Sequence, residues 1–325
     1  MTSKLPNFFK RNPPVPPSLR SYVQAVLTHL WNLRLPLIQP QSPTFLVSQT
    51  LQRTLGSHLQ DYTYVDFCAG AGGPTPAIEG QVNGLLRRMK ISKPTELDGD
   101  GLANGGAHHE EEENGVDFVL TDIHPHLTSW RRASARSPHL RYVARPVDAA
   151  DAPRDLLDWV VEGEATRGVG GGGGAGGTSS DRKKKIFRLF NLAFHHFDDE
   201  LAREIMRNTL ETSEGFAIFE LQGRDVGNLV TVLLIAPLLW LGSWYWFWGQ
   251  WGHLFWTYVV PVVPIVTVFD GLVSCLRTRR DYEVLKLVNE AAKVGGGLNG
   301  WKFEAGGETH TWPIGSMQYL IGVKD

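Results

Sequence analysis

The sequence predicts an α/β fold: a doubly wound, mostly parallel sheet of seven strands with helices on both faces. Three observations predict this fold. Segments of strand character alternate with segments of helical periodicity along most of the 325 residues. The first strand runs directly into a turn of glycines, and acidic residues follow the next two strands. Such alternation gives parallel strands joined by helical crossovers.

The most informative stretch of the chain is 64–74, where the first strand runs into its glycine turn. Glycine lets the backbone approach a ligand where a Cβ would collide. Pro74 suits the first turn of a helix, and helical spacing follows it. Strand, glycine turn and helix N-terminus together form the nucleotide-type site of α/β proteins. The glycines of this turn are Gly70, Gly72 and Gly73.

The other elements follow from the spacing of apolar residues. Helical periodicity predicts helices over 18–33, 43–59, 74–90, 153–162, 198–211 and 281–294. Apolar and β-branched runs predict strands over 62–67, 116–121, 140–147, 186–192, 215–221, 300–306 and 317–323. We expect two N-terminal helices over 18–60. The core is expected over 61–225, and the helix and two strands within 274–325 close the same core.

Three segments are expected to carry no chemistry. Residues 1–17 are rich in proline and read as a disordered lead-in without an apolar signal sequence. Residues 92–115 and 163–185 read as solvated loop inserts. The glycine run at 170–174 resembles a phosphate loop only in composition, because no strand precedes it and no GK[ST] ending follows.

Composition narrows the class of protein. A net charge of -2 gives no reason to expect nucleic-acid binding. The two cysteines, Cys68 and Cys275, form neither a disulfide framework nor a metal framework, which indicates a reducing compartment. A metal site formed by His195, His196 and Asp198 is an alternative, but we expect no bound metal.

Polar residues follow successive strands of the predicted sheet. Asp122 ends the second strand, Asp148 ends the third, and residues 191–196 end the fourth. Open α/β sheets bind ligands at the carboxyl ends of their strands. A carboxylate after the second strand is placed to accept both hydroxyls of a ribose, and one after the third can meet an adenine amino group.

These residues resemble the motifs of class I S-adenosylmethionine-dependent methyltransferases, a Rossmann-like family. Residues 65–72 resemble its first motif, D-x-G-x-G-x-G, except that Cys68 replaces the first glycine, which implies an adjusted turn. Residues 191–199 are similar to the fourth-motif region of its small-molecule members, and the closing strands fit its reversed final hairpin. The resemblance implies S-adenosylmethionine as cofactor, bound by Asp66, Cys68, Gly70, Gly72, Gly73, Asp122, Asp148 and Asn191.

A dinucleotide site is the weaker interpretation of the same turn. The pattern G-x-G-x-x-G requires Gly or Ala at its last position. Here Thr75 stands at that position, and Pro74 precedes it. A nicotinamide-dependent oxidoreductase therefore stays open only as an alternative.

Methyl transfer needs alignment above all, and it needs a base only if the acceptor loses a proton. His195 and His196 are the candidate bases, because imidazole titrates near neutrality. The competing interpretation is that the pair only shapes the wall of the cleft. We expect Asp66 to hold the methionine end of the cofactor or to order the glycine turn. Glu220, at the end of the fifth strand, is a weaker candidate.

An apolar insertion interrupts the core. Residues 226–269 contain no Asp, Glu, Lys or Arg and hold six of the eleven tryptophans. Residues 229–248 are long enough to cross a hydrocarbon layer, and a turn at 249–253 leads to a second apolar run. Both ends of the insertion lie on one side, because they join strands of one sheet. We expect an apolar helical hairpin over 226–273 that is inserted in a membrane, and a buried lid or oligomer contact is the alternative.

The sequence thus predicts a membrane-associated methyltransferase whose catalytic domain faces the cytosol. Its acceptor is expected to be a small or lipid-like molecule, and its oligomeric state stays open. A catalytically silent, methyltransferase-like membrane protein that binds a partner is the second hypothesis.

Overall fold

The computed structural model describes residues 17–91, 115–161, 184–295 and 297–325. The predicted lead-in over 1–17 and the two predicted loop inserts lie outside these ranges, except for residues at their edges.

An eight-stranded sheet forms the centre of the molecule, in the order β4-β3-β2-β1-β5-β6-β8-β7. The strands are β1 (Tyr62–Phe67), β2 (Phe118–Thr121), β3 (Leu140–Val143), β4 (Val160–Val161), β5 (Lys185–Asn191), β6 (Gly215–Glu220), β7 (Trp301–Thr311) and β8 (Gly315–Lys324). Strands β3, β2, β1, β5 and β6 are parallel. Strand β8 runs antiparallel to both β6 and β7. The mostly parallel α/β prediction is confirmed, and β8 and β7 are the reversed closing pair.

The predicted number of seven strands is wrong because of β4. We expected a helix over 153–162, but the chain forms a 3₁₀ turn at Leu156–Trp159 and then β4. Val160 and Val161 pair antiparallel with the outer edge of β3. Two adjacent β-branched residues favour this pairing over a last helical turn.

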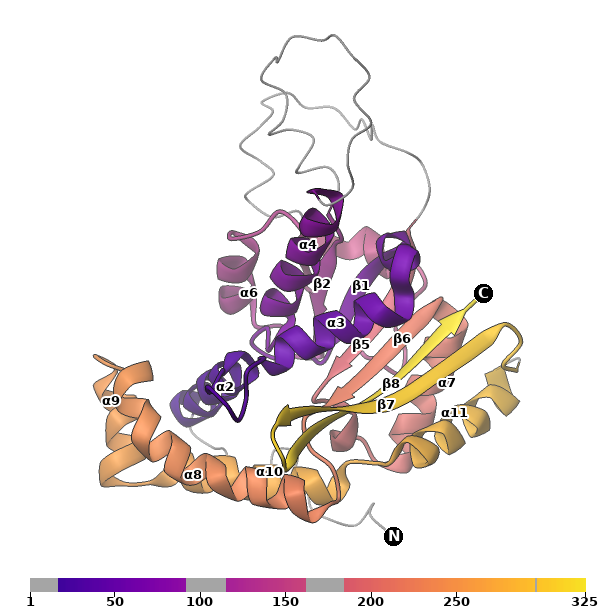
Figure 1. Cartoon of the computed structure of the whole chain (residues 1–325). Helices are drawn as coiled ribbons and strands as arrows, with labels where there is room; N and C mark the ends of the chain where they lie inside the picture. Colours follow the sequence, from indigo (N-terminus) through magenta and orange to yellow (C-terminus); the bar gives the residue numbers. More distant parts are fainter. Residues whose placement is uncertain (1–16, 92–114, 162–183, 296) are drawn as a thin grey trace, which may run out of the picture.

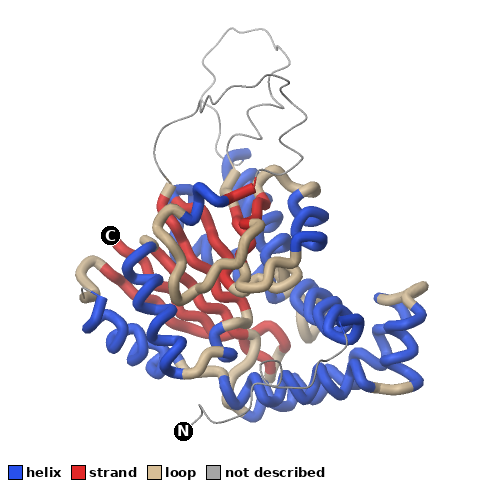
Figure 2. The backbone as a smooth tube through the Cα atoms, turned by 180° about the vertical axis from the view of Figure 1, so that it is seen from behind, coloured by secondary structure: helices blue, strands red, loops and turns tan. Residues whose placement is uncertain are grey.

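The helices cover both faces of the sheet (Figures 1 and 2). They are α2 (Pro17–Asn32), α3 (Pro43–Leu55), α4 (Thr75–Ile91), α6 (Leu127–Ser134), α7 (Asp199–Thr212), α8 (Val226–Trp246), α9 (Trp251–Leu254), α10 (Val262–Arg277) and α11 (Asp281–Gly295). One buried cluster joins the sheet to α3, α4 and α6, and a second joins it to α7 and α11.

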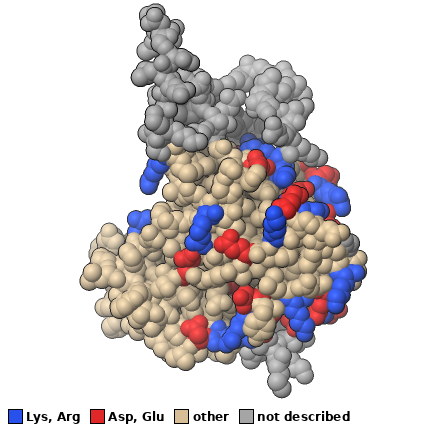
Figure 3. Space-filling model, turned by 45° about the vertical axis from the view of Figure 1, so that its right-hand side comes forward, with Lys and Arg blue, Asp and Glu red and all other residues tan. Residues whose placement is uncertain are grey.

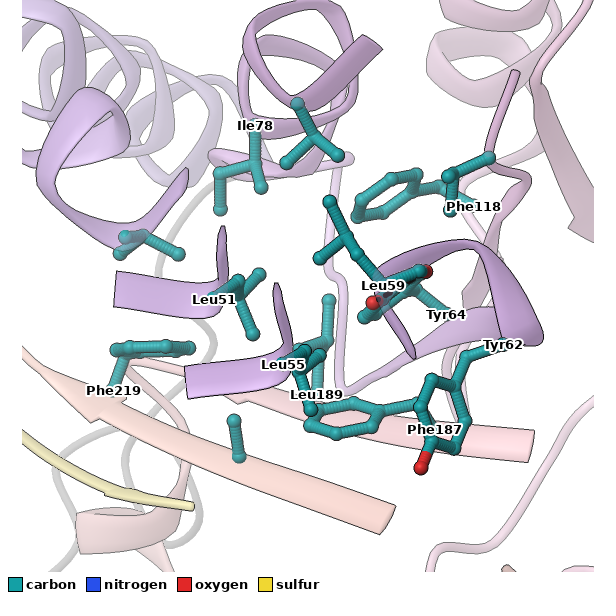
Figure 4. Close-up of a cluster of buried hydrophobic side chains, with 14 of the residues drawn as sticks. Leu51, Leu55, Leu59, Tyr62, Tyr64, Ile78, Phe118, Phe187, Leu189 and Phe219 are labelled. Atoms are coloured by element: carbon teal, nitrogen blue, oxygen red, sulfur yellow. Dashed lines mark hydrogen bonds between the residues drawn. The ribbon is translucent and has the colours of Figure 1, made fainter. Parts of the chain in front are cut away.

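Side chains that point to opposite faces of a strand belong to different clusters. Tyr62 and Tyr64 of β1 belong to the cluster on the α3 side, whereas Val65 and Phe67 belong to the cluster on the α7 side. The period of two follows from the pleat of the strand. Figure 4 shows the first cluster, where Leu51, Leu55, Leu59 and Ile78 meet the sheet residues Tyr62, Tyr64, Phe118, Phe187, Leu189 and Phe219.

Side-chain caps fix where several helices begin. Ser42 accepts a hydrogen bond from the backbone N–H of Phe45 before α3. Asp198 and Asp225 do the same for the third residue beyond them, ahead of α7 and α8. Each cap satisfies a backbone donor that the first helical turn leaves open. The cap at Asp225 therefore begins α8 directly after β6.

Helix α6 was not predicted from the sequence. It has eight residues, of which Trp130 and Ser134 are buried. Two buried positions give too little periodicity for an interpretation from spacing alone. The helix places Trp130 beside the glycine turn.

The apolar segment after β6 folds into α8, α9, a π-helical turn (Phe255–Val259) and α10. By length and composition, helix α8 could cross a membrane. Only 22% of its apolar window is buried inside the protein. The second run is bent by 73° between Trp251–Val259 and Val262–Arg277. Pro261 at this break accounts for the bend, since proline cannot continue the helical hydrogen bonding.

The α8–α10 segment (residues 226–277) extends from one side of the sheet domain (Figure 1). Helix α2 packs on its inner side through Val26, which joins Leu239, Phe247, Leu254 and Val263 in a third buried cluster. The segment is therefore held on the domain by α2 as well as by its two chain connections.

Candidate functional site

The candidate site lies where the chain reverses its direction of winding across the sheet. From β1 the chain crosses outward to β2 and β3, and from β5 it crosses to the opposite side at β6. The ends of β1 and β5 meet at this switch point, where α/β folds bind ligands. The predicted residues of the glycine turn and of the fourth strand end therefore lie side by side.

The glycine turn after β1 is built from left-handed backbone. Cys68, Gly70, Gly72 and Gly73 have φ values of 64°, 54°, 115° and 50°. Cys68 thus adopts the conformation usual for glycine and bears the strain of a side chain there. The turn is closed by a hydrogen bond of 2.8 Å from the backbone N–H of Gly72 to the carbonyl of Ala69.

A buried polar cluster lies beneath this turn. The hydroxyl of Thr75 donates to Asp66 Oδ2 at 2.5 Å, and the amide of Asn191 lies 3.3 Å from Asp66 Oδ1. Burial raises the pKa of Asp66 to about 8, against the opposing hydrogen bonds from Thr75 and Asn191. Asn191 Oδ1 is buried and has no hydrogen-bond partner within the described residues. The cluster therefore presents one acceptor that a ligand donor can satisfy.

Asp122 holds the glycine turn from the neighbouring strand. Its Oδ2 accepts from the backbone N–H of Gly70 at 2.9 Å, and its Oδ1 accepts from that of His124 at 2.8 Å. Trp130 fixes the other side of Gly70, because its ring N–H donates to the Gly70 carbonyl at 2.9 Å. The carboxylate and the indole together set the position of the turn.

Asp148 lies at the next strand end along the same edge. It is exposed, and its Oδ1 accepts from the backbone N–H of Ala150 at 2.9 Å. The loop before it is joined to the previous one by a hydrogen bond from Val147 N–H to the Asp122 carbonyl. Asp148 shares the edge with the other predicted residues but forms none of the described contacts with them.

Two neighbouring cavities open at this edge. The glycine-turn cavity, about 290 Å³, is lined by Asp66, Cys68, Gly70, Gly73 and Asn191 among others. The apolar cavity, about 320 Å³, lies between α2, α8, α10 and the ends of the strands. Leu27, Trp31, Leu192 and His196 line both cavities. A ligand in the first cavity therefore lies next to a ligand in the second.

His195 is buried in the wall of the apolar cavity and is held by Glu220. The ring Nδ1 lies 2.8 Å from Glu220 Oε2, and the backbone N–H of His195 donates to Oε1 at 3.0 Å. A carboxylate at Nδ1 fixes the tautomer with the proton on that nitrogen, which leaves Nε2 as an acceptor. The ring of His196 lies 4.0 Å away, centre to centre.

Two arginines at the end of α10 and just after it bind the histidine loop, residues 194–197. Arg277 donates to the carbonyls of His195 and His196, at 2.8 and 3.0 Å. Arg279 donates to those of Phe194 and Phe197, at 3.2 and 2.8 Å. Four consecutive carbonyls of the loop thus accept hydrogen bonds from two guanidinium groups. The α8–α10 segment is bonded directly to the loop that carries both candidate bases.

The sequence interpretation missed the partners that fix these residues. Thr75 was noted only as a mismatch to a dinucleotide motif, yet it binds Asp66. Trp130 lies in the helix that was not predicted. Its signal is a single tryptophan shortly after a strand-end acid, which is too weak to interpret alone. Within the described residues, no three His, Cys, Asp or Glu side chains come together to hold a metal ion.

Comparisons with known proteins leave the chain without an assigned family. No protein-family model matches it, and no curated protein sequence matches it. Solved structures that it resembles include LepI in complex with SAM (TM-score 0.38, 14% identity, over 84% of this chain and 46% of that one). Human N-acetylserotonin methyltransferase in complex with SAM gives a TM-score of 0.36 and 11% identity, over 86% of this chain and 55% of that one.

A protein from Rhodobacter sphaeroides assigned as a Zn-dependent alcohol dehydrogenase gives a TM-score of 0.42 and 12% identity, over 96% of this chain and 100% of that one. The chain spans about half of the length of the first two proteins. All three TM-scores lie below 0.5, and the similar structures include both a methyltransferase and a protein assigned as a dehydrogenase. The function is therefore argued from the site itself.

Proposed function

We propose that this chain is an S-adenosylmethionine-dependent methyltransferase. The observation that carries the proposal is the buried cluster of Asp66, Thr75 and Asn191 under a left-handed glycine turn, with the unpartnered acceptor at Asn191 Oδ1. The α-ammonium group at the methionine end of the cofactor is a hydrogen-bond donor suited to such a cluster. Asp122 would hold the ribose hydroxyls, and Asp148 would meet the adenine.

The fit of the residues to this cofactor has a geometric basis. Asp122 uses both carboxylate oxygens on backbone N–H groups, and each oxygen keeps a further lone pair for a hydroxyl. The exposed carboxyl of Asp148 lies one strand further along the same edge. Cys68, Gly70 and Gly73 line the cavity with backbone in the left-handed conformation, which allows close approach.

When bound, S-adenosylmethionine supplies a methyl carbon that the acceptor's lone pair attacks while the carbon–sulfur bond breaks and its electron pair stays on sulfur. The chain's own residues align the two ligands, since the two cavities share four lining residues. His195 Nε2 accepts the proton that the acceptor loses, and Glu220 holds the ring in the required tautomer. His196 lines both cavities and borders the reacting groups.

We further propose that the acceptor is apolar and reaches the site at a membrane surface. The apolar cavity is walled by α8 and α10. The segment that contains these helices exposes Leu241 and Tyr245 of α8 at 78% and 83%, and Trp251 of α9 at 67%. Lys, Arg, Asp and Glu are sparse over the lower left of the molecule in Figure 3, where this segment lies. Exposed apolar patches of this kind mark contact sites for membranes or proteins, and we assign this one to a membrane surface.

We propose an interfacial position for the segment rather than a span. Helix α2 covers the inner side of the α8–α10 segment. Both ends of this segment connect to the sheet domain. The cytosolic orientation of the catalytic domain stays a prediction from the sequence, as do the domain boundaries.

Isothermal titration tests the cofactor. We expect S-adenosylmethionine and S-adenosylhomocysteine to bind and NAD⁺ not to bind. Asp148→Ala should weaken binding of both, whereas Asp151→Ala, an exposed residue of the same loop, should leave it unchanged. Binding of NAD⁺ in place of both ligands would establish the oxidoreductase alternative. Transfer of a labelled methyl group to a membrane extract then separates an enzyme from a silent relative.

A further inference from the structure

One face of α10 forms a polar stripe on the wall of the apolar cavity, opposite the side chains of α2 and α8. Thr267, Asp270, Gly271 and Ser274 all line the cavity and stand at intervals of three, one and three residues. Such spacing places them on one face of a helix. Opposite them, α2 and α8 contribute apolar side chains, namely Val23, Leu27, Leu30, Val232, Ile235 and Leu238.

The hydroxyl of Thr267 marks the stripe as a binding surface. The residue is 4% exposed, and its Oγ1 has no hydrogen-bond partner within the described residues. A buried hydroxyl that pairs with nothing costs free energy, so such groups are normally satisfied. A ligand with a polar group beside Thr267 would form the missing hydrogen bond with its hydroxyl.

Asp270 lies one helical turn further along the stripe. It ends the uncharged run of 226–269 and is the one carboxyl among the described residues of the cavity wall. Among the described residues, Asp270 forms no salt bridge. Burial raises its pKa, and the charges of His195 and Arg277 oppose that shift. A carboxyl in an apolar wall is stabilised most by a cation that enters with the ligand.

We propose that the apolar cavity binds an amphiphile with an apolar body and a basic amine, and that Asp270 and Thr267 hold the amine. The apolar body lies against α2 and α8. The inference rests on the proposed function, since it names the class of acceptor for the same site. Asp270 and His195 line the same cavity, which sets the amine near the candidate base.

Octylamine and octan-1-ol, which share an apolar body and differ in the head group, test the inference. Their binding to the full-length protein is followed by titration calorimetry without cofactor, so the result does not depend on S-adenosylmethionine. The wild type should prefer the amine on the order of tenfold, because hydrogen bonds to charged groups are the stronger ones. Asp270→Asn should remove this preference and leave octan-1-ol binding unchanged. Asp281→Asn, which alters an exposed acid on α11, is the matched control.

A second variant locates the probe. Leu238→Trp fills the apolar cavity, so it should abolish binding of both octyl compounds. Equal wild-type affinity for the amine and the alcohol would overturn the inference, as would retention of amine binding in Leu238→Trp. Comparison of the wild-type affinities alone decides the question if Asp270→Asn does not fold. Failure of S-adenosylmethionine to bind, with the amine preference intact, would instead overturn only the proposed function.

Discussion

At the scale of single residues, the site depends on a carboxyl that burial keeps neutral. Asp66 is 1% exposed and holds Thr75 and Asn191. With a folded-state pKa of about 8, against 3.8 as the ordinary value, the folded protein binds more protons than the unfolded chain between these two pH values. The contribution of Asp66 to stability is therefore complete below pH 4 and is lost as the pH rises towards 8.

Asp66→Asn should remove this pH dependence. We expect the free energy of unfolding of the variant, relative to wild type, to increase from pH 5 to pH 8 and to stay constant above pH 9. The slope is at most about 1.4 kcal/mol per pH unit. Urea unfolding at five pH values measures it. A difference that is the same at every pH would show that Asp66 is ionised in the folded protein.

In the proposed mechanism, Glu220 positions the ring of His195. Glu220→Gln should lower the turnover number by roughly tenfold or more and leave the Kd of S-adenosylhomocysteine unchanged, because the ring loses the acceptor that fixes its tautomer. Glu220→Asp should recover part of the loss. Steady-state kinetics and calorimetry on the same samples check this. A variant that loses cofactor binding and turnover together would indicate a structural role only.

The sequence pointed to candidate residues of the site but not to the side chains that contact them. The motif pattern pointed to Asp66, Asp122 and Asn191, because strand ends follow from periodicity. The contacts of Thr75 and Trp130 depend on the left-handed turn and on the packing of α6, which periodicity does not encode. Cys68 is the instructive case: the sequence showed a departure from the motif, and the φ of 64° shows that the backbone keeps the glycine-like conformation.

At the scale of elements, helices α8 and α10 approach closely where α10 has a glycine. A Cβ on Gly271 would lie 2.7 Å from Val232 Cγ1. Gly271→Ala should therefore separate the helices and lower stability by about 1–3 kcal/mol, as overpacking does. Combining it with Val232→Ala should restore part of the loss. Thermal unfolding of the single and double variants measures both effects, and additive losses would contradict the contact.

Elements with strong patterning were predictable, and those governed by tertiary context were not. The parallel strands and helices α4, α7 and α11 follow alternation and periodicity. Strand β4 exists because the edge of β3 is available, and the bend after Val259 depends on Pro261 and the π-helical turn. Neither an available edge nor a bend angle is encoded in a hydrophobic period.

At the scale of the whole molecule, the proposed membrane contact depends on the outer face of the α8–α10 segment. We expect the wild type to float with phosphatidylcholine vesicles. The double variant Leu241→Lys with Tyr245→Lys should remain in solution, since both side chains are more than three-quarters exposed on that face. Tyr282→Lys, at an exposed site on α11, is the control and should still float. Sedimentation of all three proteins without lipid excludes aggregation as the cause.

The grip of Arg277 and Arg279 on residues 194–197 has a practical consequence for anyone who works with the protein. Deleting the α8–α10 segment to make purification easier would also remove Arg277. Two of the four hydrogen bonds that hold the loop of His195 would then be lost. A truncated protein that binds cofactor but shows no turnover would then report a loosened loop rather than a missing substrate. Amphipathic additives or nanodiscs, not truncation, are the preparation that keeps the histidine loop anchored.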